Sequence, residues 1–126
     1  MIKEVHDINV SKGFWDNKET KNVGEMLMLV TSELAEALEA DRDGKKANKE
    51  QFVKDKNTAA TVEPHLSLSI KYSFEKNIKN SFEDEIADAV IRLFDICGGL
   101  NIDLEWHIRQ KVDYNKKRPH KHGRAY

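Results

Sequence analysis

The chain has 126 residues, the length of a single domain spanning 1–126, which leaves no room for separate cofactor and catalytic domains. Its formal net charge is −1, so the whole-protein field does not favour nucleic acid, and no apolar run is long enough to cross a bilayer. Cys97 is the only cysteine and the first residues lack a signal-like apolar run, so we expect a cytoplasmic protein with neither a nucleic acid nor a membrane as partner.

Two helices are predicted in the first third of the chain. Apolar residues recur at roughly helical spacing over 2–17, with Gly13 as an interruption. The stronger pattern covers 22–41, where Asn22 can cap the helix and apolar residues recur at three- and four-residue steps. That stripe comprises Val23, Met26, Leu27, Val30, Leu34, Ala37 and Leu38. Because two further apolar residues widen it, we expect this helix to be buried on most sides, which favours a subunit interface.

The middle of the chain, 45–80, has no clear pattern. Gly44 ends the preceding helix in a charged turn, and Pro64 interrupts a stretch rich in Ser, Thr and Asn. We therefore treat 45–80 as an insertion or a mobile loop, centred on 53–70. The next helix is expected to begin among three apolar residues spaced four apart, Phe74, Ile78 and Phe82.

The pattern becomes strong again over 81–97, which is predicted to be a helix. Ser81 is a candidate N-cap, and three acidic residues follow it where the helix dipole is positive. Apolar residues then recur at helical spacing, and Gly98 and Gly99 are expected to stop the helix.

A last helix is predicted from Asp103 to about Asn115, and Pro119 prevents its continuation. No segment alternates apolar and polar residues as a strand would. The expected class is therefore all-α, in a four-helix bundle-like arrangement.

Two pairs of acidic residues are the strongest chemical signal. Glu33 and Glu36 are three apart on one predicted helix, and Glu85 and Asp88 are three apart on another, so each pair shares a helix face. Both pairs border an apolar stripe, and packing of the two helices would bring four carboxylates together. Carboxylate oxygens suit Mg²⁺, particularly when a phosphate completes its coordination. The alternative is that all four acids belong to solvated helix faces.

A basic cluster at the end of the last helix is the second signal. Lys111 and Asn115 are four apart, and Arg118 follows one turn later. A point charge, an amide donor and a forked guanidinium are groups that bind phosphate. The alternatives are a basic helix end that complements the dipole, or a solvated tail.

The two acidic motifs, ELAE at 33–36 and EIAD at 85–88, resemble those of the all-α, MazG-like nucleoside triphosphate pyrophosphohydrolases. The sequence KVDYNKKRPHKHG at 111–123 also looks like the end of a MazG-like subgroup. The resemblance covers about 20–43 and 81–124, and 1–19 loosely. The two motifs are separated by 48 residues, a longer stretch than in many members.

The resemblance implies an oligomeric helical bundle, either a homodimer or a homotetramer, with sites near subunit interfaces. It implies that the four acids bind Mg²⁺, with Mn²⁺ as a substitute, and that Glu39 assists. Lys111, Asn115 and Arg118 would hold the phosphates of a nucleoside triphosphate substrate.

The expected reaction is hydrolysis of the triphosphate to the monophosphate and pyrophosphate. Water attacks the α-phosphorus, with Glu33 or Glu36 as the base. Trp15, with Phe14 beside it, is a candidate for stacking on the nucleobase, or else an anchor of the helix core. Two other interpretations stay open: an activity on phosphoribosyl-ATP, or a non-catalytic helical interaction protein.

Overall fold

The computed structural model describes residues 1–60 and 66–119, and every regular element in them is helical. The elements in chain order are α1 (Ile2–Ser11), the 3₁₀ turn η1 (Lys18–Thr20), α2 (Val23–Arg42), α3 (Lys49–Ala59), α4 (Leu66–Asn77), α5 (Phe82–Gly99) and α6 (Leu104–Lys116). The all-α class is therefore confirmed. None of the described helices combines the length and apolar character needed to cross a membrane.

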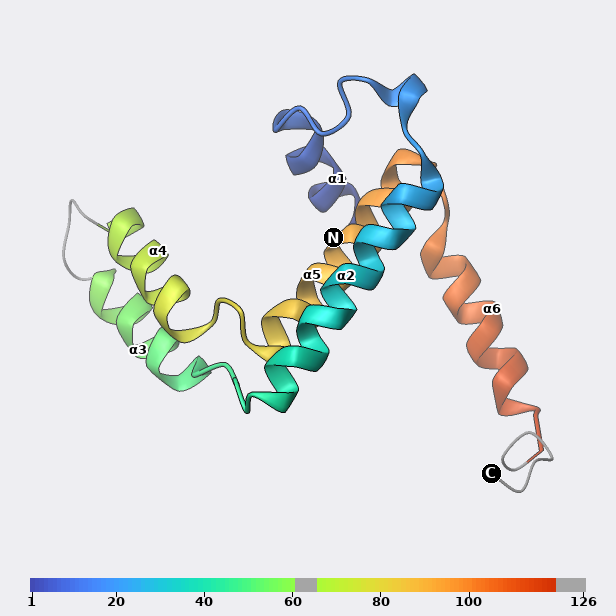
Figure 1. Ribbon diagram of the computed structural model, residues 1–126. Coiled ribbons are helices and arrows are strands. Elements are labelled where there is room, and N and C mark those ends of the chain that lie inside the picture. The colour runs from blue at the N-terminus through green and yellow to red at the C-terminus, as the bar shows by residue number, and fades with distance from the viewer. Residues whose placement is uncertain (61–65, 120–126) are drawn as a thin grey trace.

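The centre of the molecule is the antiparallel pair of α2 and α5, with α1 packed on α5 (Figure 1). Its small apolar core consists of Val30, Ala89 and Ile96, with Met26 packed against it. Since Ala89 has a short side chain, the backbones of the two long helices can approach closely at this level. The pair therefore fixes the relative position of any side chains that α2 and α5 direct toward each other.

The predicted caps Asn22 and Ser81 are confirmed, and Asp103, the predicted start of the last helix, caps α6. Asn22 Oδ1 accepts hydrogen bonds from the backbone N–H groups of Gly24 and Glu25 at 2.8 and 3.3 Å. Ser81 Oγ accepts from the N–H of Asp84, and Asp103 Oδ1 accepts from the N–H of Trp106. Each cap satisfies backbone donors that have no partner within the helix.

Two predicted helix ends are wrong. The helix expected over 2–17 ends at Ser11, because the chain turns at Gly13 with a φ of 81° and continues irregularly to η1. The helix expected to stop before Gly98 instead includes both glycines and ends at Gly99. The turn out of α5 is made by Asn101, which has a φ of 54°. Gly44, with a φ of 66°, does follow the end of α2 as expected.

The region 45–80, expected to be an insertion or mobile loop, contains the helices α3 and α4, so residues 53–59 and 66–70 are helical. The two helices form a hairpin, with Phe52 and Phe74 edge to face at 5.9 Å and Asp55 accepting hydrogen bonds from Ser73 and Asn77. Phe74, Ile78 and Phe82 do not share a helix, because α4 ends at Asn77 and α5 begins at Phe82. Pro64 lies outside the described residues.

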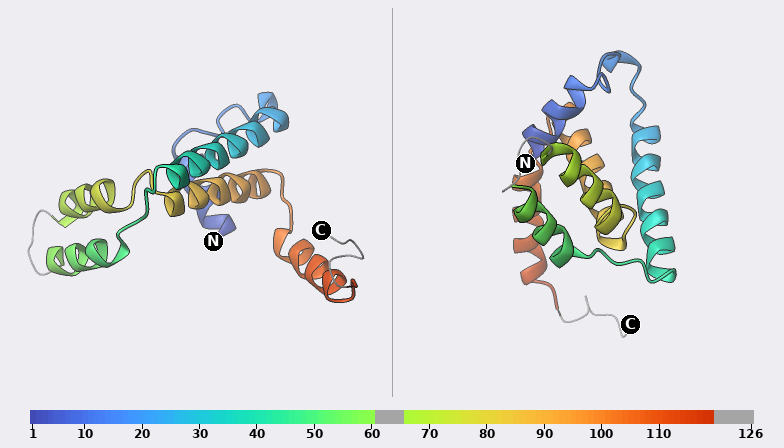
Figure 2. Two further views of the ribbon diagram at one scale, coloured as in Figure 1. Left: turned by 60° about the horizontal axis from the view of Figure 1, so that its bottom comes forward. Right: turned by 90° about the vertical axis from the view of Figure 1, so that its left-hand side faces the viewer.

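The six α-helices of the described residues do not form one four-helix bundle. The α3–α4 hairpin lies beyond one end of the α2–α5 pair, and α6 leads away from its other end (Figures 1 and 2). Many large apolar side chains on α2, α5 and α6 are exposed in this arrangement. The packing within one chain is therefore limited mainly to α1, α2 and α5, and to the separate hairpin.

Candidate functional site

Three of the four predicted acids gather between α2 and α5. One carboxylate oxygen from each of Glu33, Glu36 and Glu85 lies within 4.8 Å of the others. Glu33 and Glu85 are buried, whereas Glu36 is exposed. Asp88, one turn after Glu85 on α5, is not a member of this group of three. The antiparallel packing of the two helices thus produces the convergence that the paired motifs predict.

The electrostatics of the cluster favour a bound cation. Burial raises the pKa of Glu85, and the nearby carboxylate of Glu36 raises it further. Burial also raises the pKa of Asp88, followed by the charges of Asp84 and Glu33. Both shifts mean that ionised carboxylates are held close together with too little positive charge around them.

The three gathered acids fit Mg²⁺ by their chemistry. Each supplies hard carboxylate oxygens from two rigid helices, and the exposure of Glu36 leaves a route for a cation and its waters. Mg²⁺ is commonly held by few carboxylates together with water and substrate phosphate, so a partly open group of this kind is appropriate.

One cation of the chain contacts this cluster. Arg92 Nε donates to Glu33 Oε1 at 2.6 Å, and the arginine lies one turn beyond Asp88 on α5. The positive charge of Arg92 opposes the rise in the pKa of Asp88 but does not outweigh burial and the neighbouring acids.

A pocket of about 280 Å³ adjoins the acids. Glu33, Asp88 and Arg92 are among its lining residues, with Asn9, Lys21 and Asp95 as further polar members. The apolar lining residues are Phe14, Trp15, Met26, Leu29, Ile91 and Ile96. The pocket therefore combines acidic groups, which suit a metal, with apolar and aromatic groups, which suit a planar ring.

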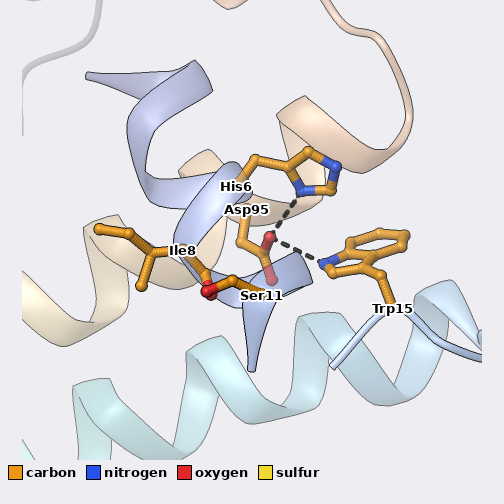
Figure 3. A network of polar contacts seen from close by, with 5 residues as sticks. All are labelled: His6, Ile8, Ser11, Trp15 and Asp95. Atoms are coloured by element: carbon orange, nitrogen blue, oxygen red, sulfur yellow. Dashed lines mark hydrogen bonds and ion pairs between the residues drawn. The ribbon is translucent and has the colours of Figure 1, made fainter. Parts of the chain in front are cut away.

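The wall of the pocket is fixed by hydrogen bonds to Asp95 (Figure 3). Its Oδ1 accepts from Trp15 Nε1 at 2.9 Å and pairs with His6 Nδ1 at 2.8 Å. The rings of His6 and Trp15 also meet edge to face, with centroids 4.9 Å apart. This network attaches α1 and the following turn to α5 beside the pocket.

Trp15 is a buried core residue, and its ring also lines the pocket. A Cβ atom added at Gly99 would lie 1.9 Å from the Trp15 ring, and one at Gly98 would lie 2.5 Å from His6. The two glycines therefore permit close packing onto α5 rather than ending it. Phe14, in contrast, is mostly exposed at the pocket and is the more accessible ring for a ligand.

The predicted phosphate-binding cluster lies elsewhere in the same chain. Lys111 and Arg118 both approach the ring of Tyr114, at 5.4 and 5.9 Å from its centroid, and Asn115 is its neighbour on α6. α6 leads away from the α2–α5 pair in both figures of the whole chain. Within the described residues, no hydrogen bond or ion pair joins this cluster to the four acids.

Four polar residues that line the pocket were not predicted: Asn9, Lys21, Arg92 and Asp95. Arg92 and Asp95 could have been found from the spacing on α5, because positions 88, 92 and 95 lie four and three apart and share a helix face. Comparisons with protein-family models, with curated proteins and with solved structures each found no match to this chain.

Proposed function

We propose that this protein is a MazG-like nucleoside triphosphate pyrophosphohydrolase that requires Mg²⁺. The observation that carries the proposal is the gathering of Glu33, Glu36 and Glu85 within 4.8 Å, beside a pocket with an apolar wall. A metal beside a pocket with apolar and aromatic lining suits a nucleotide, because the metal would bind the charged phosphates and the apolar groups would contact the base. The two acidic motifs add support through their resemblance to this family.

In the proposed reaction, Glu33, Glu36, Glu85 and Asp88 would hold Mg²⁺. The bound ion would supply Lewis-acid stabilisation of the charge that develops on the phosphate oxygens. Glu33 or Glu36 accepts a proton from water as the water oxygen bonds to the α-phosphorus. The bond from that phosphorus to the bridging oxygen breaks, and pyrophosphate leaves with the electron pair. Glu39 is a more distant assistant on the same helix.

The pocket is the proposed site for the nucleoside. Phe14 and Trp15 supply aromatic surface for the base, and the acidic side directs the phosphates toward the metal. Lys111, Asn115 and Arg118 would bind the phosphate chain from a second copy of the protein, because their own α6 leads away from the acids. The proposed functional unit is therefore a homo-oligomer, at least a dimer.

The test is release of pyrophosphate, as distinct from orthophosphate, from a panel of ribo- and deoxyribonucleoside triphosphates with Mg²⁺. We expect the wild type to release pyrophosphate, Glu36→Gln to lose at least about 100-fold in kcat/KM, and Mn²⁺ to restore part of the activity of metal-free wild type. Glu50→Gln, which changes an exposed acid on α3, is the matched control and should retain full activity.

Three outcomes separate the proposal from its rivals. Pyrophosphate release from phosphoribosyl-ATP, and from no other nucleotide, would identify phosphoribosyl-ATP as the substrate. No release from any substrate, together with no Mg²⁺-dependent rise in melting temperature, would favour a non-catalytic helical protein and refute the proposal. Equal activity of wild type and Glu36→Gln would show that the acidic cluster does not take part in the reaction.

A further inference from the structure

Arg92 occupies the boundary between the acidic cluster and the pocket. Its Nε donates to Oε1 of Glu33 at 2.6 Å, on the side of the acids. Its side chain is 40% exposed, whereas that of Glu33 is 9% exposed. Arg92 also lines the pocket together with Asp88. The guanidinium therefore reaches a buried carboxylate at one edge and open space at another.

The donors of Arg92 are only partly used. Within residues 1–60 and 66–119, its hydrogen bond to Glu33 involves Nε alone, and its two terminal nitrogens have no protein partner. Because the guanidinium is planar, the bond from Nε to Glu33 also limits the orientation of the two terminal nitrogens. That forked set of donors matches two oxygens of one phosphate group.

We propose that Arg92 binds the phosphate chain of the nucleotide through its terminal nitrogens while Nε holds Glu33 in place. In the metal-free protein the same guanidinium supplies positive charge that a divalent cation would otherwise bring to Glu33. This inference rests on the proposed function and adds a phosphate-binding residue from the same chain as the acids.

The two roles make opposite predictions for one substitution. Arg92 competes with a cation for the charge of Glu33, so removing the guanidinium should strengthen binding of Mg²⁺ alone. The same removal takes away donors to phosphate, so it should weaken binding of the nucleotide in the presence of Mg²⁺. An ion pair that served only to join α2 and α5 would not separate the two affinities in this way.

The experiment is titration calorimetry on wild type, Arg92→Gln and the control Arg109→Gln, which breaks an exposed ion pair with Glu105 on α6. The probes are Mg²⁺ alone, and then the α,β-imido analogues of the common nucleoside triphosphates with saturating Mg²⁺. For Arg92→Gln we expect Mg²⁺ to bind about threefold more tightly and the analogue roughly 10- to 100-fold more weakly. Arg109→Gln should match the wild type on both probes.

Arg92→Lys extends the test if Arg92→Gln does not fold, as judged by its helical circular dichroism. Lysine keeps the charge but loses the forked donors, so affinity for Mg²⁺ should stay near that of the wild type while affinity for the analogue falls. Unchanged analogue affinity in the folded variants, with a wild type that releases pyrophosphate, would overturn this inference and leave the proposed function intact. A wild type that neither binds any analogue nor releases pyrophosphate would overturn both.

Discussion

At the scale of single residues, the acidic cluster lowers the stability of the metal-free protein. Glu85 is buried between α2 and α5, and its raised pKa reflects burial first and the neighbouring acids second. The folded state therefore holds a proton on this carboxylate more tightly than the unfolded chain does. Ionisation at neutral pH opposes folding, and Mg²⁺ would relieve that opposition.

This reasoning gives a pH dependence with a definite sign. Below the ordinary glutamate pKa of about 4.5, Glu85 is protonated in both states and its contribution to folding is complete. As the pH rises above that value and through the raised folded pKa, that contribution is lost, so the melting temperature of the metal-free protein should fall over this interval. Stabilisation by Mg²⁺ should grow over the same interval, as thermal melts with and without a chelator would show.

Glu85→Gln should remove the part of this dependence that comes from Glu85, because the amide carries no charge, and leave the part that comes from Asp88. We expect its metal-free melting temperature at pH 7 to exceed that of the wild type by about 2–5 °C and its stabilisation by Mg²⁺ to be lost. Glu50→Gln, on the exposed surface of α3, should change neither quantity. A metal-free Glu85→Gln protein that melts below the wild type, yet is still stabilised by Mg²⁺, would contradict this account.

At the scale of elements, the glycines at the end of α5 make packing possible. A Cβ atom at Gly99 would lie 1.9 Å from the ring of the buried Trp15. Alanine normally improves a helix by about 1 kcal/mol relative to glycine. Overpacking against a large buried ring costs about 1–3 kcal/mol. Because the Trp15 ring itself must move at this distance, we expect this cost to exceed the gain in helix propensity.

Gly99→Ala is accordingly expected to lower the free energy of unfolding by about 1–3 kcal/mol in urea denaturation. It should also weaken nucleotide binding, because Trp15 lines the pocket. The control is Gly44→Asn, where nothing lies within 4 Å of an added Cβ atom and the φ is 66°. The left-handed backbone alone should cost it about 1 kcal/mol, and nucleotide binding should not change. A Gly99→Ala protein as stable as the wild type would show that Trp15 can move without cost.

The helices differ in how well sequence predicts them. Local signals were sufficient for α2, α5 and α6, since Asn22 and Ser81 cap the first two as expected and the last helix starts after Asp103 as predicted. They failed for α3 and α4, because these helices are stabilised by contacts with each other, including Asp55 to Ser73. The predicted helix end at Gly98 and Gly99 was wrong for a similar reason. These glycines pack against the rings of His6 and Trp15, which lie more than 80 residues away in the chain.

The candidate site shows the same division. The spacing of the acidic motifs placed Glu33, Glu36 and Glu85 on faces that do meet, because two amphipathic helices pack by their stripes. The pairing of Arg92 with Glu33 depends on the register between α2 and α5, which spacing along one helix does not contain. Within this chain α6 leads away from the α2–α5 pair. That direction is set by the turn between α5 and α6, so the spacing of Lys111, Asn115 and Arg118 does not predict how far they lie from the acids.

At the scale of the whole molecule, a single chain leaves too much apolar surface uncovered. Leu34 and Leu38 on α2 are about half exposed, and so are Ile108 and Val112 on α6. Large exposed apolar surfaces of this kind are typical of subunit interfaces. A second copy that covers α2 and α5 with α6 would bury these surfaces and bring Lys111 toward the acids of its partner.

This arrangement can be tested by mixing two inactive variants, Glu36→Gln and Lys111→Ala, after unfolding and refolding them together. If each site takes its acids from one chain and its basic cluster from the other, every mixed dimer holds one intact site and one doubly altered site. Random mixing should then restore roughly a quarter of wild-type activity, since half of the dimers are mixed and each has one working site of two. If both parts came from one chain, every site would keep one defect and no activity would return. Light scattering on the same samples must give at least a dimer mass, because a monomeric protein could not exchange sites at all.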